Sequence, residues 1–255
     1  MNEAITKNLW LSALAEIAAL RQDSARLLFK RLSGQGQAFQ LKNRHLVCVD
    51  EGITAGIHVA GSGILLSPEQ RETIVREAKI EIFTTHDNCG AYALANPAAP
   101  DKNAACKAWG EQEAARLGLP HRHITVDQMD RPKQMHNAVA IYYDGTGRFN
   151  RIPGLPSGFV ISRKYFVDAT KDLELCVKIA FGEHGFGKRF ELSAPLNIVV
   201  IADPSDSQLR LKTLFEEAET VAKKFEPMRI LVQGLKMPLG RTSYQTENAA
   251  AETAA

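Results

Sequence analysis

Short apolar runs alternate with longer helical segments along most of this chain, and this alternation limits the possible folds more than any other feature. The apolar runs rich in β-branched residues are 45–50, 80–84, 123–126, 138–143, 159–161, 196–202 and 229–232. The segments with helical spacing and capping signals are 68–79, 101–118, 168–181 and 205–225. Strands alternating with helices predict an α/β fold, in which a central, mostly parallel sheet is flanked by helices on both faces.

The chain carries no Pro/Ser-rich linker, and its residues show no internal repeat. We therefore expect a single α/β domain over residues 1–245, with 150–157 as the best candidate for an internal boundary. The Ala- and Glu-rich tail, 246–255, is predicted to be disordered. Residues 2–32 are predicted to be helical, and they either pack on their own domain or form an arm that reaches a second subunit.

Composition excludes several classes of protein. The net charge of +2 gives no strong field for nucleic acid or an anionic membrane. No apolar run approaches the roughly 18–20 residues of a membrane span, and the N-terminus lacks a signal-peptide pattern. A cytoplasmic location is therefore expected. Four cysteines in 255 residues are too few for a disulfide scaffold, so they are expected to be free thiols or metal ligands.

Three potential metal ligands follow two of the predicted strands. Cys48 lies at the end of the first strand, and His86 and Cys89 come just after the strand at 80–84. Because the carboxyl ends of parallel strands meet at one edge of a sheet, the three side chains are expected to converge. Zinc accepts thiolate sulfur and imidazole nitrogen, and three protein ligands leave a fourth position for water.

The His-x-x-Cys spacing is a weak motif by itself, because two core side chains can share that spacing. The upstream strand-end cysteine shifts the interpretation toward a metal. We therefore predict a Zn²⁺ site on Cys48, His86 and Cys89. The remaining cysteines, Cys106 and Cys176, lie in predicted helices and are interpreted as buried small apolar residues.

These motifs resemble those of the β-class carbonic anhydrases. Cys48-Val49-Asp50 is similar to the start of that family's Cys-x-Asp-x-Arg signature, and 86–90 is similar to its His-x-x-Cys-Gly signature. The resemblance covers about residues 40–150, and the segment at 196–234 is interpreted as an extra C-terminal α/β unit. It implies a homodimer or higher homo-oligomer, and a reaction that hydrates carbon dioxide reversibly to bicarbonate through a hydroxide generated at the metal.

One departure from the family concerns the partner of Asp50. The family places an Arg two residues after its Asp, and that Arg holds the Asp away from the metal, whereas this chain has Gly52 there. Two alternatives follow. Asp50 orients the catalytic water while another cation, such as Arg44 or Arg131, holds it, or Asp50 binds zinc itself and closes the site. We take Asp50 as the catalytic residue.

The sequence offers several candidates for the substrate pocket and for the proton carrier. Val59, Ile64 and Tyr92 are candidate walls of a narrow apolar pocket. A histidine could carry the proton away because its unperturbed pKa is about 6.5, and the candidates are His45, His58, His121, His123 and His136.

Three alternative functions remain. The first is hydrolysis of carbon disulfide or carbonyl sulfide at the same metal. The second is a non-catalytic zinc protein in which Asp50 closes the site. The third, and weakest, is nucleotide binding by the segment 182–188, which has the Gly-x4-Gly-Lys spacing but follows a predicted helix and carries Arg189 in place of Ser or Thr.

Overall fold

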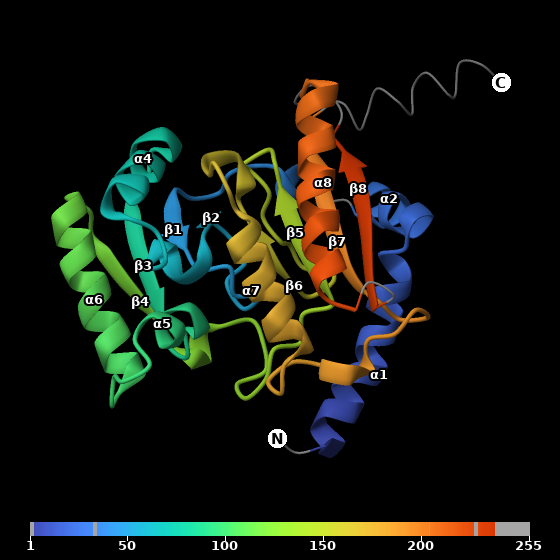
Figure 1. Cartoon of the computed structure of the whole chain (residues 1–255), viewed down its shortest axis with the longest axis horizontal. Helices are drawn as coiled ribbons and strands as arrows, with labels where there is room; N and C mark the ends of the chain where they lie inside the picture. The colour runs from blue at the N-terminus through green and yellow to red at the C-terminus, as the bar shows by residue number, and fades with distance from the viewer. Residues whose placement is uncertain (1–2, 33–34, 204, 227–228, 238–255) are drawn as a thin grey trace.

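The computed structural model describes residues 3–32, 35–203, 205–226 and 229–237 (Figure 1). The predicted disordered tail, 246–255, lies outside the described residues. The α-helices are α1 (Glu3–Ala19), α2 (Gln22–Arg31), α3 (Gln35–Ala38), α4 (Pro68–Ala78), α5 (Gly90–Ala95), α6 (Lys102–Leu117), α7 (Thr170–Phe181) and α8 (Gln208–Lys224). The short 3-10 helices are η1 (Ala60–Gly63), η2 (Val126–Gln128), η3 (Arg163–Tyr165) and η4 (Gly187–Arg189).

The strands form two parallel sheets, which confirms the predicted α/β class. The strands are β1 (His45–Val47), β2 (Ile57–His58), β3 (Ile82–His86), β4 (His121–Ile124), β5 (Ala140–Asp144), β6 (Gly158–Ile161), β7 (Leu196–Ala202) and β8 (Ile230–Lys236). The first sheet has the order β2-β1-β3-β4 and the second has the order β6-β5-β7-β8. The sheets separate between β4 and β5, whereas residues 150–157 belong to the connection between β5 and β6.

The two sheets share one topology. If the strands of each sheet are numbered from its own first strand, both orders read 2-1-3-4, with all pairs parallel. We call residues 45–124 the first repeat and residues 140–236 the second repeat. They lie side by side in Figure 1. The segment at 196–234, which the sequence indicates to be an extra α/β unit, therefore belongs to a second complete sheet. The topology of the first sheet is repeated, although the amino-acid sequence shows no repeat.

The repeats meet where β2 approaches β6. The backbone N–H of Ser162 donates to the carbonyl oxygen of His58 at 3.0 Å, and the His58 N–H donates to the Ser162 hydroxyl at 2.9 Å. The edge of the first sheet at β2 is thus occupied by the same chain. The homodimer stays a prediction, and a second copy would have to bind elsewhere, because this edge is taken.

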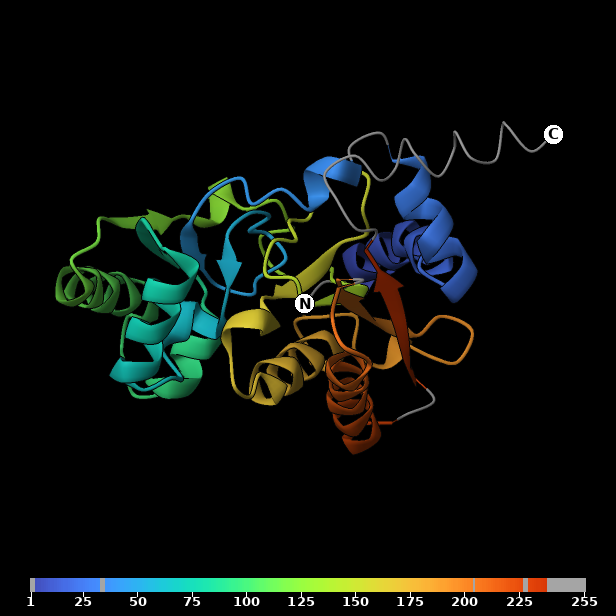
Figure 2. The ribbon, with the colours of Figure 1, turned by 90° about the horizontal axis from the view of Figure 1, so that it is seen from above.

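The N-terminal helical region consists of two helices, where the sequence pattern predicts one. The chain turns at Arg21, whose φ of −59° and ψ of 150° are not helical. α1 and α2 lie against the face of the second sheet opposite α7 and α8 (Figure 2). The Trp10 ring packs edge-on against Phe186 with centroids 5.0 Å apart, and Glu16 accepts from the Ser157 N–H at 2.9 Å. The region therefore packs on its own chain.

Helices cover both faces of the second sheet, and its strands are correspondingly apolar. Every residue of β5 and β7 is buried, which is expected of parallel strands covered on both sides. In the first repeat, α6 packs along β3 and β4. Helix α4 of the same repeat begins with a capping box in which Ser67 accepts from the Gln70 N–H. Among the described helices, none has the length and apolar character needed to cross a bilayer.

Candidate metal centre

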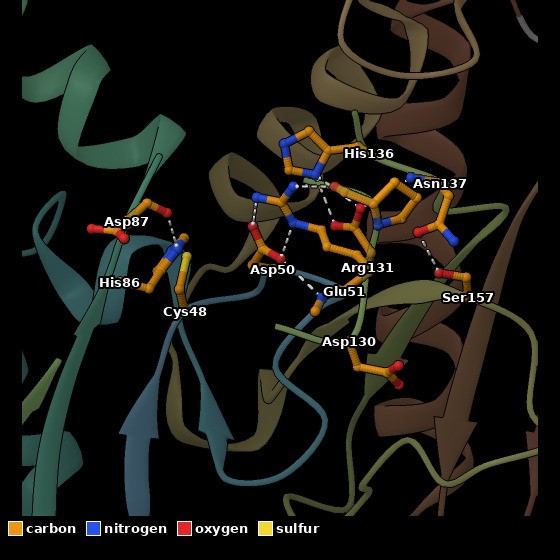
Figure 3. Close-up of polar contacts among 12 residues, drawn as sticks. Cys48, Asp50, Glu51, His86, Asp87, Asp130, Arg131, His136, Asn137 and Ser157 are labelled. Carbon is orange, nitrogen blue, oxygen red and sulfur yellow. Dashed lines mark hydrogen bonds and ion pairs between the residues drawn. The ribbon is translucent and has the colours of Figure 1, made fainter. Parts of the chain in front are cut away.

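The three predicted ligands meet at the carboxyl edge of the first sheet. Cys48 follows β1, His86 is the last residue of β3, and Cys89 precedes α5. Since β1 and β3 are adjacent and parallel, with Leu46 opposite Phe83, their ends lie at one edge. One ligand atom from each of the three residues lies within 4.8 Å of the others, and all three residues are buried. Figure 3 shows Cys48 and His86 side by side at this edge.

The chemistry of the His86 ring fits a metal ligand. Its Nδ1 is 2.8 Å from the carbonyl oxygen of Asp87 and donates to it, which leaves Nε2 as the nitrogen that can bind a metal. Nε2 is buried and has no hydrogen-bond partner within the part of the chain that the structure describes. A buried polar atom without a partner is costly. A cation at this position would satisfy it, as metal-bound histidines generally use their other nitrogen for a hydrogen bond of this kind.

The protonation of the two thiols and of His86 also bears on metal binding. The neighbouring Cys89 thiol and burial raise the pKa of Cys48, while the neighbouring Cys106 thiol and burial raise the pKa of Cys89 to about 12. Burial lowers the pKa of His86, but Cys48 and Asp50 outweigh it and raise that pKa to about 9. Without a metal ion, the two thiols and the His86 ring therefore all hold their protons. A divalent ion would displace them, because thiolates and neutral imidazole are the species that bind zinc.

Arg131 supplies the cation that the sequence motif lacks. Its Nε donates to Asp50 Oδ1 at 2.8 Å and its Nη2 donates to Asp50 Oδ2 at 3.1 Å, a bidentate pair drawn in Figure 3. The two side chains are only 3% and 4% exposed. The other candidate cation, Arg44, donates to the Ala78 carbonyl instead. Burial raises the pKa of Asp50, but His86 and Arg131 outweigh it and hold that pKa at about 2.

The donors around Asp50 leave one of its oxygens partly free. Oδ1 accepts from Arg131 Nε and from the Gly52 N–H at 2.9 Å, whereas Oδ2 accepts only from Arg131 Nη2 among the described residues. Asp50 does not belong to the cluster formed by Cys48, His86 and Cys89. Its Oδ2 therefore retains the capacity to accept one more hydrogen bond.

A second buried carboxylate, Glu51, pairs with His136. The His136 Nδ1 lies 3.0 Å from Oε1 and 2.8 Å from Oε2 of Glu51, and the Asn137 N–H donates to Oε1 at 3.1 Å. The sequence pattern predicts no role for Glu51, because its partner is 85 positions away. Cys106, interpreted from the sequence as an apolar residue, is buried beside Cys89 and outside the three-ligand cluster.

A pocket of about 610 Å³ adjoins the metal edge. Asn88 and Gly90, on either side of Cys89, form part of its wall, together with Arg131 and His136. The second repeat contributes α7 and the residues after it, so the pocket lies between the two repeats. The remaining lining residues are Lys133, Gln134, Met135, Lys178, Ile179, Gly182, Glu183 and His184. The predicted walls Val59, Ile64 and Tyr92 are not among them.

The structure separates the five candidate proton carriers. His45 and His121 begin β1 and β4, at the sheet edge opposite the ligands. His58 is fully buried, its Nδ1 lies 3.0 Å from the Cys48 carbonyl, and burial lowers its pKa to about 4. His123 Nε2 pairs with Asp87 at 2.9 Å. Of these five histidines, only His136 lines the pocket.

The second repeat carries no comparable cluster among the described residues. At the end of β5, Asp144 is fully buried and accepts from the N–H groups of Thr146 and Phe149 at 2.8 and 3.0 Å, so its own turn satisfies it. β7, the counterpart of β3, ends at Ala202. The segment 182–188 follows helix α7, where a phosphate-binding loop would follow a strand.

No protein-family model, curated protein or solved structure matches the chain significantly. The two short motifs and the geometry of this site are therefore what indicate a function.

Gly61 packs against the ligands so closely that a side chain should disturb them. Its N–H donates to Cys48 Sγ at 3.2 Å, its φ is +53°, and an added Cβ would lie 2.6 Å from Ile64 Cγ2 and 2.9 Å from Ala91 Cβ. We expect Gly61→Ala to lower the free energy of unfolding by about 1–3 kcal/mol and to weaken zinc binding. Chemical denaturation and a zinc competition titration measure the two effects.

Gly90→Ala is the matched control for this substitution. An added Cβ at Gly90 would find its nearest neighbour, Ile179 Cδ1, at 3.7 Å, which is ordinary contact. The control should leave stability unchanged or slightly higher, because alanine is favoured over glycine inside a helix. Equal stabilities of the two variants would contradict the tight packing described at Gly61.

Proposed function

We propose that this protein is a zinc-dependent enzyme that catalyses the reversible hydration of carbon dioxide to bicarbonate. The observation that carries the proposal is the convergence of Cys48, His86 and Cys89 beside an Asp50 carboxylate that Arg131 holds ionised. The choice of carbon dioxide also depends on the resemblance of 48–50 and 86–90 to the β-class signatures.

Each part of the site has a role in this reaction. A zinc ion bound by the three residues would supply Lewis acidity, which makes a water molecule nucleophilic near neutral pH. The two thiolates cancel the formal charge of the ion, so a nearby acceptor helps to activate that water. Asp50 Oδ2 provides the acceptor, and its remaining lone pair would orient the water by accepting one of its protons in a hydrogen bond.

Arg131 and Gly52 position the acceptor. Together they donate three hydrogen bonds to the Asp50 carboxylate, which fixes its plane and favours its ionised form. A carboxylate held in this way is less free to swing onto the metal and close the fourth position. This supports Asp50 as an orienting residue over Asp50 as a zinc ligand.

A stopped-flow hydration assay on zinc-loaded protein tests the proposal. We expect wild-type protein to accelerate hydration, and Asp50→Ala to keep one zinc per chain while losing about 10²- to 10⁴-fold in kcat, the usual contribution of a positioned acid–base group. Carbonyl sulfide and carbon disulfide should be assayed in parallel, because the same site chemistry suits them.

The alternative outcomes are distinguishable. Zinc-loaded wild-type protein without activity on any of the three gases would favour the non-catalytic zinc protein. A gain of activity in Asp50→Ala would identify Asp50 as an inhibitory ligand. Turnover of the sulfur compounds alone would keep the metal site and change the substrate.

A further inference from the structure

Hydration of carbon dioxide releases one proton per turnover, and the buried site offers few routes for it. The three ligands and Asp50 are each no more than 5% exposed. The proton must pass from the buried site beside Asp50 to solvent. The pocket of about 610 Å³ adjoins this edge and lies between the two repeats.

We propose that His136, oriented by Glu51, is the residue that carries this proton from the site into the pocket. One ring nitrogen of His136, one oxygen of Glu51 and one oxygen of Asp50 lie within 4.8 Å of one another. His136 thus lies close to Asp50, and it also lines the pocket. Figure 3 shows Asp50, Arg131, Glu51 and His136 as one cluster. The inference rests on the proposed function.

Glu51 determines which nitrogen of the ring exchanges protons. Its carboxylate is completely buried and receives the His136 Nδ1–H, with the Asn137 N–H as a further donor. Nδ1 is therefore occupied, and Nε2 is the nitrogen that accepts and releases a proton. The side chain of His136 is 14% exposed, and it lines the pocket.

The charges around His136 favour its protonated form. Burial lowers the pKa of His136, but Glu51 and Asp50 outweigh both burial and Arg131 and raise it above its ordinary value. The other charged or titratable side chains that line the pocket are Lys133, Lys178, Glu183 and His184. Carbon dioxide and water yield bicarbonate and one proton. His136 Nε2 accepts that proton and then releases it to a buffer molecule.

The direction in which kcat changes with pH follows from this proton transfer. Hydration needs His136 without a proton on Nε2, so kcat should rise with pH through the pKa of His136. Glu51→Gln removes the charge that raises this pKa, so the midpoint should move to lower pH. A purely structural role of the pair would change stability without moving this midpoint.

The test compares His136→Ala with His184→Ala, a matched control in the same pocket that has no buried carboxylate partner among the described residues. At low buffer concentration, His136→Ala should lower kcat by about 100-fold or more, leave kcat/KM unchanged, and recover when imidazole is added. His184→Ala should behave as wild type. NMR titration of the His136 ring should give a midpoint above 6.5 that falls in Glu51→Gln.

The outcomes separate this inference from the proposed function. An active wild type together with a His136→Ala variant that retains full kcat in dilute buffer, or that imidazole cannot rescue, would overturn the relay alone. A His136 midpoint that Glu51→Gln does not lower would also overturn it. An inactive zinc-loaded wild type would remove the proposed function and the relay with it.

Discussion

Cys89→Ser is expected to cost the protein its zinc. Structural zinc binds with about 10–16 kcal/mol spread over four ligands, so loss of one thiolate should weaken binding by about 3 kcal/mol or more, roughly a hundredfold or greater. The effect should be large here because Cys89 shares its cluster with only Cys48 and His86. Competition against a chelator of known affinity measures the change, and hydration activity should disappear with the metal.

Two further cysteine variants are controls for this experiment. Cys176 is buried in α7 and lies outside the cluster, so Cys176→Ser should keep zinc. Cys106→Ser should also keep zinc, although Cys106 lies beside Cys89. Loss of zinc in Cys106→Ser would make this residue a fourth ligand and the site a closed one, which would contradict a catalytic role. Wild-type affinity in Cys89→Ser would contradict the ligand assignment itself.

Arg131→Met is expected to be strongly destabilising. It removes one member of an ion pair whose side chains are 3% and 4% exposed, and so leaves the Asp50 carboxylate buried without its partner. Breaking a buried pair in this way costs about 3–5 kcal/mol. Chemical denaturation measures the loss. Activity should fall as well, because Asp50 would no longer be held away from the metal.

The double variant Asp50→Asn/Arg131→Met separates charge from packing. With both charges removed, much of the lost stability should return. Lys133→Met is the matched control. Lys133 belongs to the same segment, but its one ion pair among the described residues is an exposed pair with Asp127, so the substitution should change stability by less than about 1 kcal/mol. An Arg131→Met variant as stable as the Lys133→Met variant would contradict the account of the pair.

The sequence predicts most of the first sheet and its ligands because the relevant signals are local. β1 and β3 are apolar runs, and Cys48 and His86 stand at their ends, where the rule for parallel sheets applies. β2 was not predicted, because it has only two residues, Ile57–His58, within a Gly-rich stretch. The break at Arg21 was missed because apolar periodicity continues through it.

The rest of the site depends on contacts between distant residues. Arg131 lies 81 positions from Asp50, and the sequence could offer it only as one of two candidates. Glu51 belongs to the first repeat, and its partner His136 lies in the segment that leads into the second repeat. No local sequence pattern predicts this pair. The repeated topology is invisible in the residues because different side chains fill equivalent positions.

The two repeats illustrate how a site depends on few residues within a fold. Both place loops at the carboxyl edge of a 2-1-3-4 sheet. The first repeat places cysteine and histidine at this edge. The second repeat ends β5 with Asp144, whose carboxylate accepts hydrogen bonds from the turn that follows it. The second repeat also contributes α7 to the pocket wall. The second repeat therefore helps to enclose the site of the first.

X-ray absorption at the zinc edge of the wild-type protein tests the central claim most directly. The account predicts one zinc per chain, with two sulfur atoms at about 2.3 Å, one nitrogen at about 2.0–2.1 Å and one light atom from solvent. Three or four sulfur ligands, a shell without sulfur, or protein that retains no zinc would contradict it.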